Sequence, residues 1–294
     1  MVIAFINRHS GKSNDQEKEL AGYLKESFGD DLDLNFFESG DLKAKIEEKL
    51  SSDTKILLIA GGDGTVNAGV NALKNKDIAL GVIPYGTFND FARVLKIPLD
   101  LKKSVECIED GDKEKIDIAE VNGRRYVNNS SLGIYPQTLA SRDRIVRDFG
   151  LGKMLSMVIS FFRTFQRFPM YYIHLIAEEE KYSFKTPFVF IGNNIYDFKV
   201  ENVGDRRKLD EGKLCLVFTS CRYRFCLIKN AFLKLFGKLK NEKYLSEKHL
   251  EEVIIDSKKK KLKVSMDGEI LELKPPLRYK ILPKALQVIV PRNE

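Results

Sequence analysis

Residues Lys55–Asn67, KILLIAGGDGTVN, carry the strongest structural signal in the sequence. Its apolar run Ile56–Ala60 predicts a buried strand, and the apolar positions within Val66–Leu73 share one face of a helix. The glycines of Gly61–Gly64 would let the backbone approach a bulky ligand, and the first helical turn offers N–H groups to a phosphate. Asp63 would repel that phosphate unless Mg²⁺ lay between them. The stretch predicts a phosphate-binding turn, with a purely structural Gly-Gly turn as the alternative.

Similar elements surround this stretch. Strand-like runs occupy Val2–Ile6, Leu32–Phe37 and Ala79–Ile83, and helical periodicity covers about residues 15–28 and 41–50. This alternation of strands and helices favours a Rossmann-like α/β domain with a mostly parallel sheet. Ligands bind such sheets at the carboxyl ends of the strands. The polar loops that follow two of the strands, including the glycine-rich one, fall at such ends.

The pattern changes near Asn122-Gly123. From there on, short and often alternating runs separated by turns favour a mainly antiparallel β-sandwich domain. The predicted strands are Arg125–Asn129, Tyr171–Ala177, Phe184–Ile191, Leu214–Thr219, Val253–Asp256, Lys261–Met266, Ile270–Leu273, Leu277–Leu282 and Leu286–Val290. Helical segments at about residues 151–168 and 225–240 interrupt them. We therefore predict two domains, residues 1–122 and 123–294, with a final strand that can pack back onto the first.

Composition narrows the class of partner. The 294 residues include 49 Lys+Arg and 42 Asp+Glu, a net charge of +7. This modest excess suits an anionic partner such as a nucleotide or an acidic lipid surface, and it equally suits ordinary solubility. It is the only feature behind a nucleic-acid-binding role, which we do not predict. No run of about 18 apolar residues occurs, so we expect no membrane-spanning helix.

Cysteine and histidine usage predicts a reduced, cytoplasmic protein. The four cysteines form no C-x-x-C pair, and the start of the chain has neither the basic segment nor the long apolar run of a secretory signal. The three histidines, at positions 9, 174 and 249, are too far apart in the sequence for a zinc motif.

Two further loops carry candidate phosphate contacts. Ser10–Ser13 ends like a P-loop, but Ile6 stands where that motif requires its first glycine. Residues of Asn7–Gly11 can still donate hydrogen bonds to a phosphate as a secondary loop. Pro84–Arg93 follows a strand and opens a helix, and its Gly86-Thr87 pair can contact a nucleotide.

Three aspartates complete the candidate site. Asp63 and Asp90 lie in the glycine-rich loops, and Asp117 lies within the apolar strand Lys115–Ala119, where a carboxylate is costly unless it is paired or serves a cation. Each has a structural alternative, because Asp90 could cap a helix and Asp117 could be a satisfied edge residue. Together they favour a cation site at one edge of the sheet.

The motifs GGDGTVN (Gly61–Asn67) and PYGTFNDFAR (Pro84–Arg93) together resemble the diacylglycerol kinase catalytic domain, in particular the soluble bacterial lipid kinases, which are similar to sphingosine kinases. The resemblance extends almost end to end. Further matching segments are INRHSG (Ile6–Gly11), VNNSSLGI (Val127–Ile134), KLDEGKL (Lys208–Leu214), DGE (Asp267–Glu269) and LPKALQVIVP (Leu282–Pro291). GGDGT alone is shared with NAD kinases and phosphofructokinases, whereas GT-x-NDFAR with a late DGE is more specific. The resemblance implies a phosphofructokinase-like ATP-binding first domain and a β-rich lipid-acceptor second domain.

The resemblance also implies roles for individual residues. The residues implied to bind ATP are Asn7, Arg8, His9, Ser10, Gly11, Gly61, Gly62, Asp63, Gly64, Thr65, Val66, Asn67, Gly86, Thr87 and Asn89. The residues implied to bind Mg²⁺ are Asp63, Asp90 and Asp117 in a metal–water network, and Lys208, Glu211 and Lys213 in a structural metal loop, where the two lysines would bind through their backbone carbonyls. The implied catalytic residues are Asp267, Glu269 and Asp63, and one of the first two would take the proton from the lipid hydroxyl.

The sequence departs from the family pattern at four places. Arg8 replaces the usual proline, and Ala68 replaces the glutamate that commonly follows GGDGT-x-N. Glu211 stands where aspartate is common in the metal loop, and Asn194–Asp197 replaces a glycine cluster. The first two departures touch the nucleotide loops. The last two bear on the structural metal and the lipid pocket.

We therefore predict an ATP- and Mg²⁺-dependent lipid kinase that phosphorylates the hydroxyl of a lipid such as diacylglycerol. It would be cytoplasmic and would dock transiently on membranes; a homodimer is left open. The basic amphipathic segment Phe225–Lys240 and the aromatic segment Phe161–Phe168 are candidate membrane contacts. The alternatives are an NAD kinase or other small-molecule kinase of the same superfamily, and a catalytically weak nucleotide- or lipid-binding protein.

Overall fold

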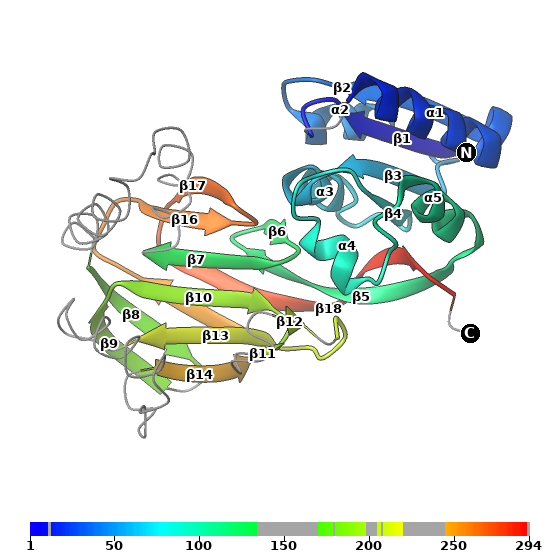
Figure 1. The fold of residues 1–294 in the computed structure, drawn as a ribbon. Helices are drawn as coiled ribbons and strands as arrows, with labels where there is room; N and C mark the ends of the chain where they lie inside the picture. Colours follow the sequence, from blue (N-terminus) through cyan, green and yellow to red (C-terminus); the bar gives the residue numbers. More distant parts are fainter. Residues whose placement is uncertain are drawn as a thin grey trace, which may run out of the picture. The chain divides into compact units, whose positions relative to one another are not determined.

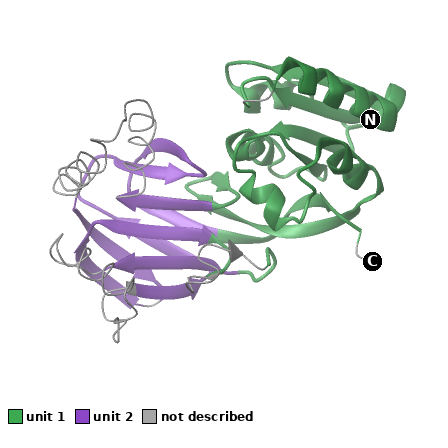
Figure 2. Ribbon diagram, in the orientation of Figure 1, with its two compact units in different colours: residues 1–128, 193–212, 281–294 green, residues 129–192, 213–280 purple. Residues whose placement is uncertain are grey.

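The computed structural model describes residues 1–10, 13–133, 170–178, 180–197, 205–206, 208–219 and 245–292 (Figure 1). The chain forms two compact units, coloured separately in Figure 2. Unit 1 comprises Met1–Asn128, Asn193–Gly212 and Ile281–Glu294, and unit 2 comprises Asn129–Gly192 and Lys213–Lys280. The boundary after residue 128 lies six residues beyond the predicted domain boundary at 122, and the last strand, β18 (Leu277–Val290), begins in unit 2 and ends in unit 1.

Unit 1 is built on a mostly parallel sheet, which also contains an antiparallel pair of strands. Its strands are β1 (Val2–Asn7), β2 (Leu32–Phe37), β3 (Ile56–Gly61), β4 (Ala79–Pro84), β5 (Asp112–Val121) and β6 (Arg124–Tyr126). The order is β2-β1-β3-β4, followed by the end of β18, where Val288 pairs in parallel with Leu80. β3 lies in the middle and is almost wholly buried, as its continuous apolar run predicts.

Helices cover both faces of this sheet. They are α1 (Asn14–Phe28), α2 (Leu42–Lys49), α3 (Asp63–Ala72), α4 (Asp90–Val94) and α5 (Leu101–Asp110), with a 3₁₀ turn, η1 (Gly29–Asp31). Alternate β3 residues face opposite ways: Leu57 and Ile59 pack with α2 and α3, whereas Leu58 and Ala60 pack with α1 and α5. The predicted first, second and third helices are confirmed; α5 was not predicted.

Unit 2 consists of two antiparallel sheets. Its strands are β7 (Asn129–Gly133), β8 (Tyr171–Ala177), β9 (Glu180–Thr186), β10 (Phe188–Asn193), β13 (Leu214–Thr219), β14 (Leu245–Leu250), β15 (Glu252–Asp256), β16 (Leu262–Met266) and β17 (Glu269–Leu273). One sheet has the order β14-β13-β10-β7-β16-β17, and the other joins the start of β18 to β15, β8 and β9. Phe184 of one stacks on Phe218 of the other, with ring centroids 5.1 Å apart. The predicted fold class is confirmed.

Three differences from the predicted strands have clear reasons. The predicted strand Phe184–Ile191 is two strands in different sheets, because the chain changes sheet at Pro187, which has no N–H to donate. The two predicted final strands are one, β18, which continues through Lys284 at φ +51°. The edge strand β14 was missed because its sequence LSEKHL has no strong apolar alternation.

A small ribbon of β11 (Tyr196–Asp197) and β12 (Asp205–Arg206) belongs to unit 1. The predicted helices at about residues 151–168 and 225–240 lie outside the described residues, as do Gly11 and the two candidate membrane segments. In the described ranges, no helix combines the length and apolar character needed to cross a membrane.

Candidate functional site

Three loops meet at the carboxyl ends of adjacent parallel strands in unit 1, after β1, β3 and β4 (Figure 1). The first two are joined by a hydrogen bond, in which the Asn7 amide donates to the Thr65 hydroxyl at 2.8 Å. The Asn7 side-chain oxygen in turn accepts from the backbone N–H of His9 at 2.9 Å. Asn7 thus fixes its own loop and links it to the start of α3.

The second and third loops touch through their glycines. A Cβ on Gly86 would lie 2.3 Å from the Gly62 Cα and 2.8 Å from the Gly62 nitrogen, so no side chain fits there. Asn89 closes the third loop at φ +55°, accepting from the Gly86 N–H and donating to the Gly86 carbonyl. Because Gly62 and Gly86 have no side chains, no Cβ stands between the two loops beside the start of α3, which favours the approach of a ligand to the N–H groups there.

Asp63 ties the third loop to the second. Its carboxylate accepts from the Phe91 N–H at 3.0 Å, the Asp90 N–H at 3.3 Å and the Asn128 amide at 3.2 Å. Asp63 therefore caps the start of α4 while standing in the first turn of α3. Asp90, predicted as a second metal ligand, is exposed in the same loop. The structure brings Asp63 and Asp90 together.

Asp117 is held differently. It is 1% exposed, and its two carboxylate oxygens accept backbone N–H groups from Gly212 at 2.7 Å and from Lys284 at 2.9 Å. Its own N–H donates to the Leu209 carbonyl at 2.7 Å. These bonds satisfy the buried carboxylate that the strand pattern marks as costly, and they anchor the loop that precedes Lys213. The metal role of Asp117 stays a prediction.

Two buried asparagines connect these aspartates and were not among the predicted site residues. Asn128, which donates to Asp63, also accepts on its carbonyl from the Asn193 N–H at 2.9 Å. The Asn193 amide donates to the carbonyls of Val127 and, at 3.4 Å, Asp117. Both side chains are less than 7% exposed. The sequence does carry a signal for them: each belongs to an Asn-Asn pair next to an apolar run, and burying an asparagine side chain is costly unless it finds hydrogen-bond partners.

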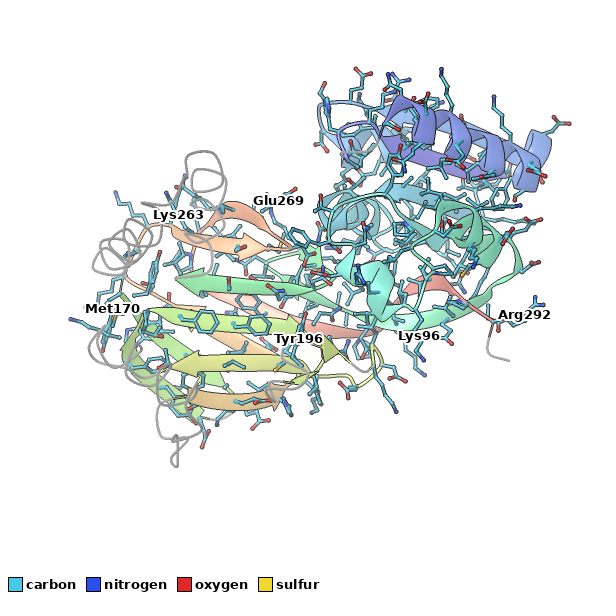
Figure 3. All side chains as sticks on the ribbon, viewed as in Figure 1. Lys96, Met170, Tyr196, Lys263, Glu269 and Arg292 are labelled. Carbon is cyan, nitrogen blue, oxygen red and sulfur yellow. The ribbon has the colours of Figure 1, made fainter. Side chains whose placement is uncertain are left out.

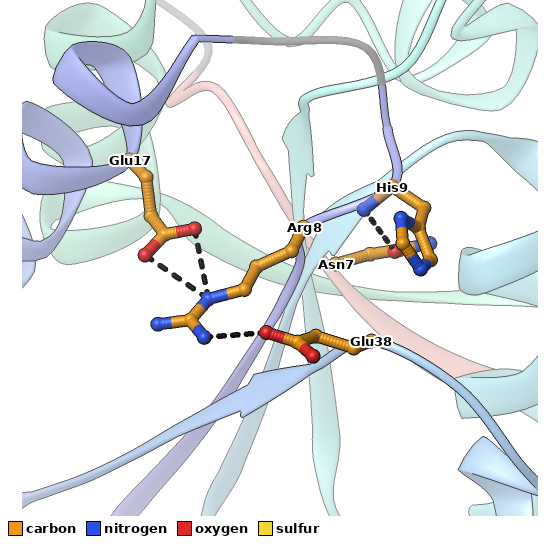
Figure 4. A network of polar contacts seen from close by, with 5 residues as sticks. All are labelled: Asn7, Arg8, His9, Glu17 and Glu38. Carbon is orange, nitrogen blue, oxygen red and sulfur yellow. Dashed lines mark hydrogen bonds and ion pairs between the residues drawn. The ribbon is translucent and has the colours of Figure 1, made fainter.

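Arg8, the residue in place of the usual proline, is occupied by two glutamates (Figure 4). Its Nε donates to Glu17 at 3.0 Å and its Nη1 donates to Glu38 at 2.6 Å. The bond to Arg8 lowers the pKa of the Glu38 carboxyl, and the bonds to Glu38 and Glu17 raise the pKa of the Arg8 guanidinium. Arg8 therefore anchors the first loop between α1 and the end of β2.

Two of the departures from the family pattern contact each other in unit 1. The Glu211 carboxylate accepts from the Ile195 N–H at 3.0 Å, and the Glu211 N–H donates to the Asn194 side-chain oxygen at 3.1 Å. Asn194 adopts φ +65°, a conformation that glycine takes most readily and asparagine tolerates. Glu211, which is one methylene longer than aspartate, thus binds the segment Asn194–Asp197 that replaces the glycine cluster.

The predicted catalytic carboxylates of unit 2 lie in a tight hairpin. Met266 pairs with Glu269 across the turn Asp267-Gly268, whose φ values of +47° and +88° confirm the predicted hairpin turn. The Asp267 carboxylate accepts from the Asn129 N–H at 3.1 Å, and its own N–H donates to the Asn129 carbonyl. Glu269 is exposed at the start of β17 (Figure 3).

The structure places the other predicted residues as follows. Gly61, Gly64, Thr65, Val66 and Asn67 lie at the end of β3 or in α3, and Thr87 is exposed in the third loop. Ser10 ends the described part of the first loop, and Lys208 is exposed in unit 1. Lys213 belongs to unit 2, where its ammonium pairs with Glu251 at 2.8 Å.

Comparisons with known proteins identify the family. The diacylglycerol kinase catalytic domain model matches residues 1–121. A protein named "putative lipid kinase" in Staphylococcus haemolyticus is 30% identical to this chain over an alignment 316 positions long. The alignment covers 99% of this chain and 96% of that protein. The chain belongs to the diacylglycerol kinase family of lipid kinases. The family and enzyme class predicted from GGDGT, GTFNDFAR and DGE are thereby confirmed.

Two further comparisons agree. A diacylglycerol kinase of Staphylococcus carnosus is 40% identical over 98 residues, which are 33% of this lipid kinase and 32% of that protein. The crystal structure of "a putative diacylglycerol kinase" from Bacillus anthracis superposes with a TM-score of 0.75 at 22% identity, covering 98% of this chain and 96% of that one. The superposition supports the assigned two-domain fold.

The residues of this lipid kinase fit the implied Mg²⁺ in part. Mg²⁺ prefers oxygen ligands, keeps several waters and is usually bound through one or two carboxylates. Asp63 and Asp90 supply two carboxylates in adjoining loops, although the Asp63 oxygens also accept N–H groups. Asp63 and Asp90 therefore stay the predicted Mg²⁺ ligands beside the three loops.

The glycine contact makes a testable prediction. We expect Gly86→Ala to separate the second and third loops, lowering the free energy of unfolding by about 1–3 kcal/mol and raising KM for ATP. Gly62→Ala is the matched control for stability, since a Cβ there would lie 3.5 Å from the Gly86 Cα, an ordinary contact. Urea denaturation and initial rates measure both effects. Equal stability of the two variants would mean that the loops do not depend on this contact.

Proposed function

We propose that the chain is an ATP- and Mg²⁺-dependent lipid kinase whose acceptor is the hydroxyl of a lipid such as diacylglycerol. The observation that carries the proposal is the meeting of three phosphate-type loops at adjacent strand ends, tied by Asn7, Gly86 and Asp63. Family membership supplies the lipid kinase chemistry. The nucleotide, the metal and the lipid are our inference from the motifs.

In this proposal the backbone N–H groups at the start of α3 bind the phosphates of ATP, and Mg²⁺ held by Asp63 and Asp90 would neutralise phosphate charge. The lipid hydroxyl oxygen attacks the γ-phosphorus, the bond to the β-phosphate oxygen breaks, and ADP leaves. Asp267 accepts the hydroxyl proton, with Glu269 as the second candidate base. The protein's main contributions are orientation and stabilisation of charge.

The lipid acceptor resides in a membrane, so the enzyme would act from the cytoplasm and dock on the membrane surface transiently. The net charge of +7 supports attraction to an acidic bilayer.

One assay tests the proposal. The protein is incubated with labelled ATP and Mg²⁺ and with diacylglycerol, monoacylglycerol, phosphatidylglycerol, sphingosine or ceramide in mixed micelles, and with NAD in a parallel reaction. We expect label on a lipid hydroxyl and loss of the signal when EDTA removes Mg²⁺. Label on NAD alone would replace the proposal with a small-molecule kinase, and label on no acceptor would favour a nucleotide- or lipid-binding protein.

A further inference from the structure

Three side chains with different donor atoms meet on one face of the six-stranded sheet of unit 2. They are Cys215 on β13 and Glu247 and His249 on β14, and one potential ligand atom of each lies within 4.8 Å of the other two. We propose that this cluster is a zinc-binding site, separate from the kinase chemistry.

Strand register creates the cluster. Cys215 pairs directly with His249, and the next same-face pair is Val217 with Glu247, so the thiol, imidazole and carboxylate all project from one face. The opposite face of the same strands packs toward β9, where Phe218 stacks on Phe184 and the Lys248 ammonium donates to the Tyr182 hydroxyl at 2.6 Å. The alternation of β14 is thereby fixed, which holds Glu247 and His249 on the side of Cys215.

The combination of sulfur, nitrogen and oxygen ligands favours Zn²⁺ over Mg²⁺. Thiolate, imidazole and carboxylate are the ligands that Zn²⁺ takes, with bonds of about 2.0–2.3 Å, whereas Mg²⁺ prefers oxygen in an octahedral arrangement. His249 Nε2 and Glu247 Oε1 are already 3.0 Å apart. Binding takes Cys215 as the thiolate, so its Sγ proton passes to solvent as the zinc–sulfur bond forms. Three protein ligands leave a fourth position for water.

The location indicates a structural or regulatory role. β14 is one edge of the sheet, and the hairpin of Asp267 joins the two strands at the other edge, with β13, β10 and β7 between. Zinc would cross-link the edge strand to its neighbour and stabilise the folded form by RT ln(1 + c/Kd), where c is the free zinc concentration. Cys215 is buried, while Glu247 and His249 are exposed and give the ion access.

Metal titration of the full-length protein, first freed of metal by chelation, tests the site. We expect one equivalent of Zn²⁺ to bind and to raise the melting temperature, Co²⁺ to give a thiolate-to-cobalt charge-transfer band, and Mg²⁺ to give neither effect. Removing an outer partner of a metal ligand costs about 10–100-fold in affinity, so His249→Ala and Glu247→Ala should each weaken Zn²⁺ binding at least about tenfold. Both substitutions are on the exposed edge strand and should leave folding intact.

Matched variants make the result specific. Cys215→Ser should abolish the cobalt band, whereas Cys107→Ser, the Cys221→Ser/Cys226→Ser double variant and His174→Ala should keep it with unchanged Zn²⁺ affinity. The proposal is overturned if the band persists in Cys215→Ser, if Zn²⁺ affinity is unchanged in His249→Ala, or if the wild-type protein binds no Zn²⁺. None of these readouts depends on kinase activity, so the zinc site and the lipid kinase function stand or fall separately.

Discussion

Replacing Asp63 with alanine is expected to abolish phosphoryl transfer and to lower the free energy of unfolding by about 2–3 kcal/mol. The carboxylate accepts from the N–H groups of Asp90 and Phe91 and from the Asn128 amide. A fully buried donor without an acceptor costs about 1–3 kcal/mol, but the Asp90 bond is exposed and the other two are only partly buried, so water takes over part of these bonds and the total stays near the cost of one such donor. The candidate Mg²⁺ ligand is lost at the same time, so we expect the rate to fall by at least about 100-fold. Initial rates with labelled ATP and urea denaturation measure the two effects.

Two further variants separate charge from structure. Asp63→Asn keeps an acceptor oxygen for the α4 N–H groups, so it should recover part of the stability while remaining inactive. Asp100→Ala is the matched control: Asp100 caps α5 by accepting from the Lys103 N–H at 3.0 Å, so its loss should cost about 1 kcal/mol of stability without changing the rate. An active Asp63→Ala enzyme with normal stability would remove Asp63 from both roles.

Replacing Asp267 with asparagine should leave ATP binding nearly unchanged and reduce turnover by about 10²–10⁴-fold, the usual contribution of a positioned base. The substitution is conservative in structure, because asparagine tolerates the φ of +47° and its side-chain oxygen can still accept from the Asn129 N–H. The neutral amide cannot take the proton. ATP affinity and kcat, measured separately, test this split.

The hairpin supplies its own controls. Glu272, on the same strand as Glu269, is exposed and forms an ion pair with Lys261 at 3.2 Å, so Glu272→Gln should have wild-type kcat. Glu269→Gln tests the second candidate base. Full turnover in Asp267→Asn together with loss in Glu269→Gln would assign the base to Glu269 instead.

Local sequence predicts the elements and motifs of this chain well. The apolar run before Gly61 specifies a buried strand, and the same alternation of strands and helices specifies the parallel sheet of unit 1, because side-chain periodicity follows backbone geometry. The turn at Asp267-Gly268 was predictable from its residue types alone. The family followed from motifs whose spacing is local to each loop.

Local sequence patterns could not predict which distant segments pair with each other. The short, polar β14 became a strand because β13 offers it a partner, and the chain changed sheets at Pro187 because β7 and β8 lie in different sheets. The amide network of Asn128 and Asn193 joins segments more than 60 residues apart, so no spacing rule could reveal it.

Local sequence is thus enough to predict the glycine-rich loops, most helices and strands of unit 1 and the kinase family, since each rests on neighbouring residues. The folded structure was needed to show which backbone groups Asp117 binds, that Glu211 contacts Asn194, and that His249, isolated in the sequence, lies beside Cys215 and Glu247. The physical reason is the same in each case. Buried polar groups and strand partners are chosen by contacts that form when distant segments pack, and a linear pattern records only the near ones.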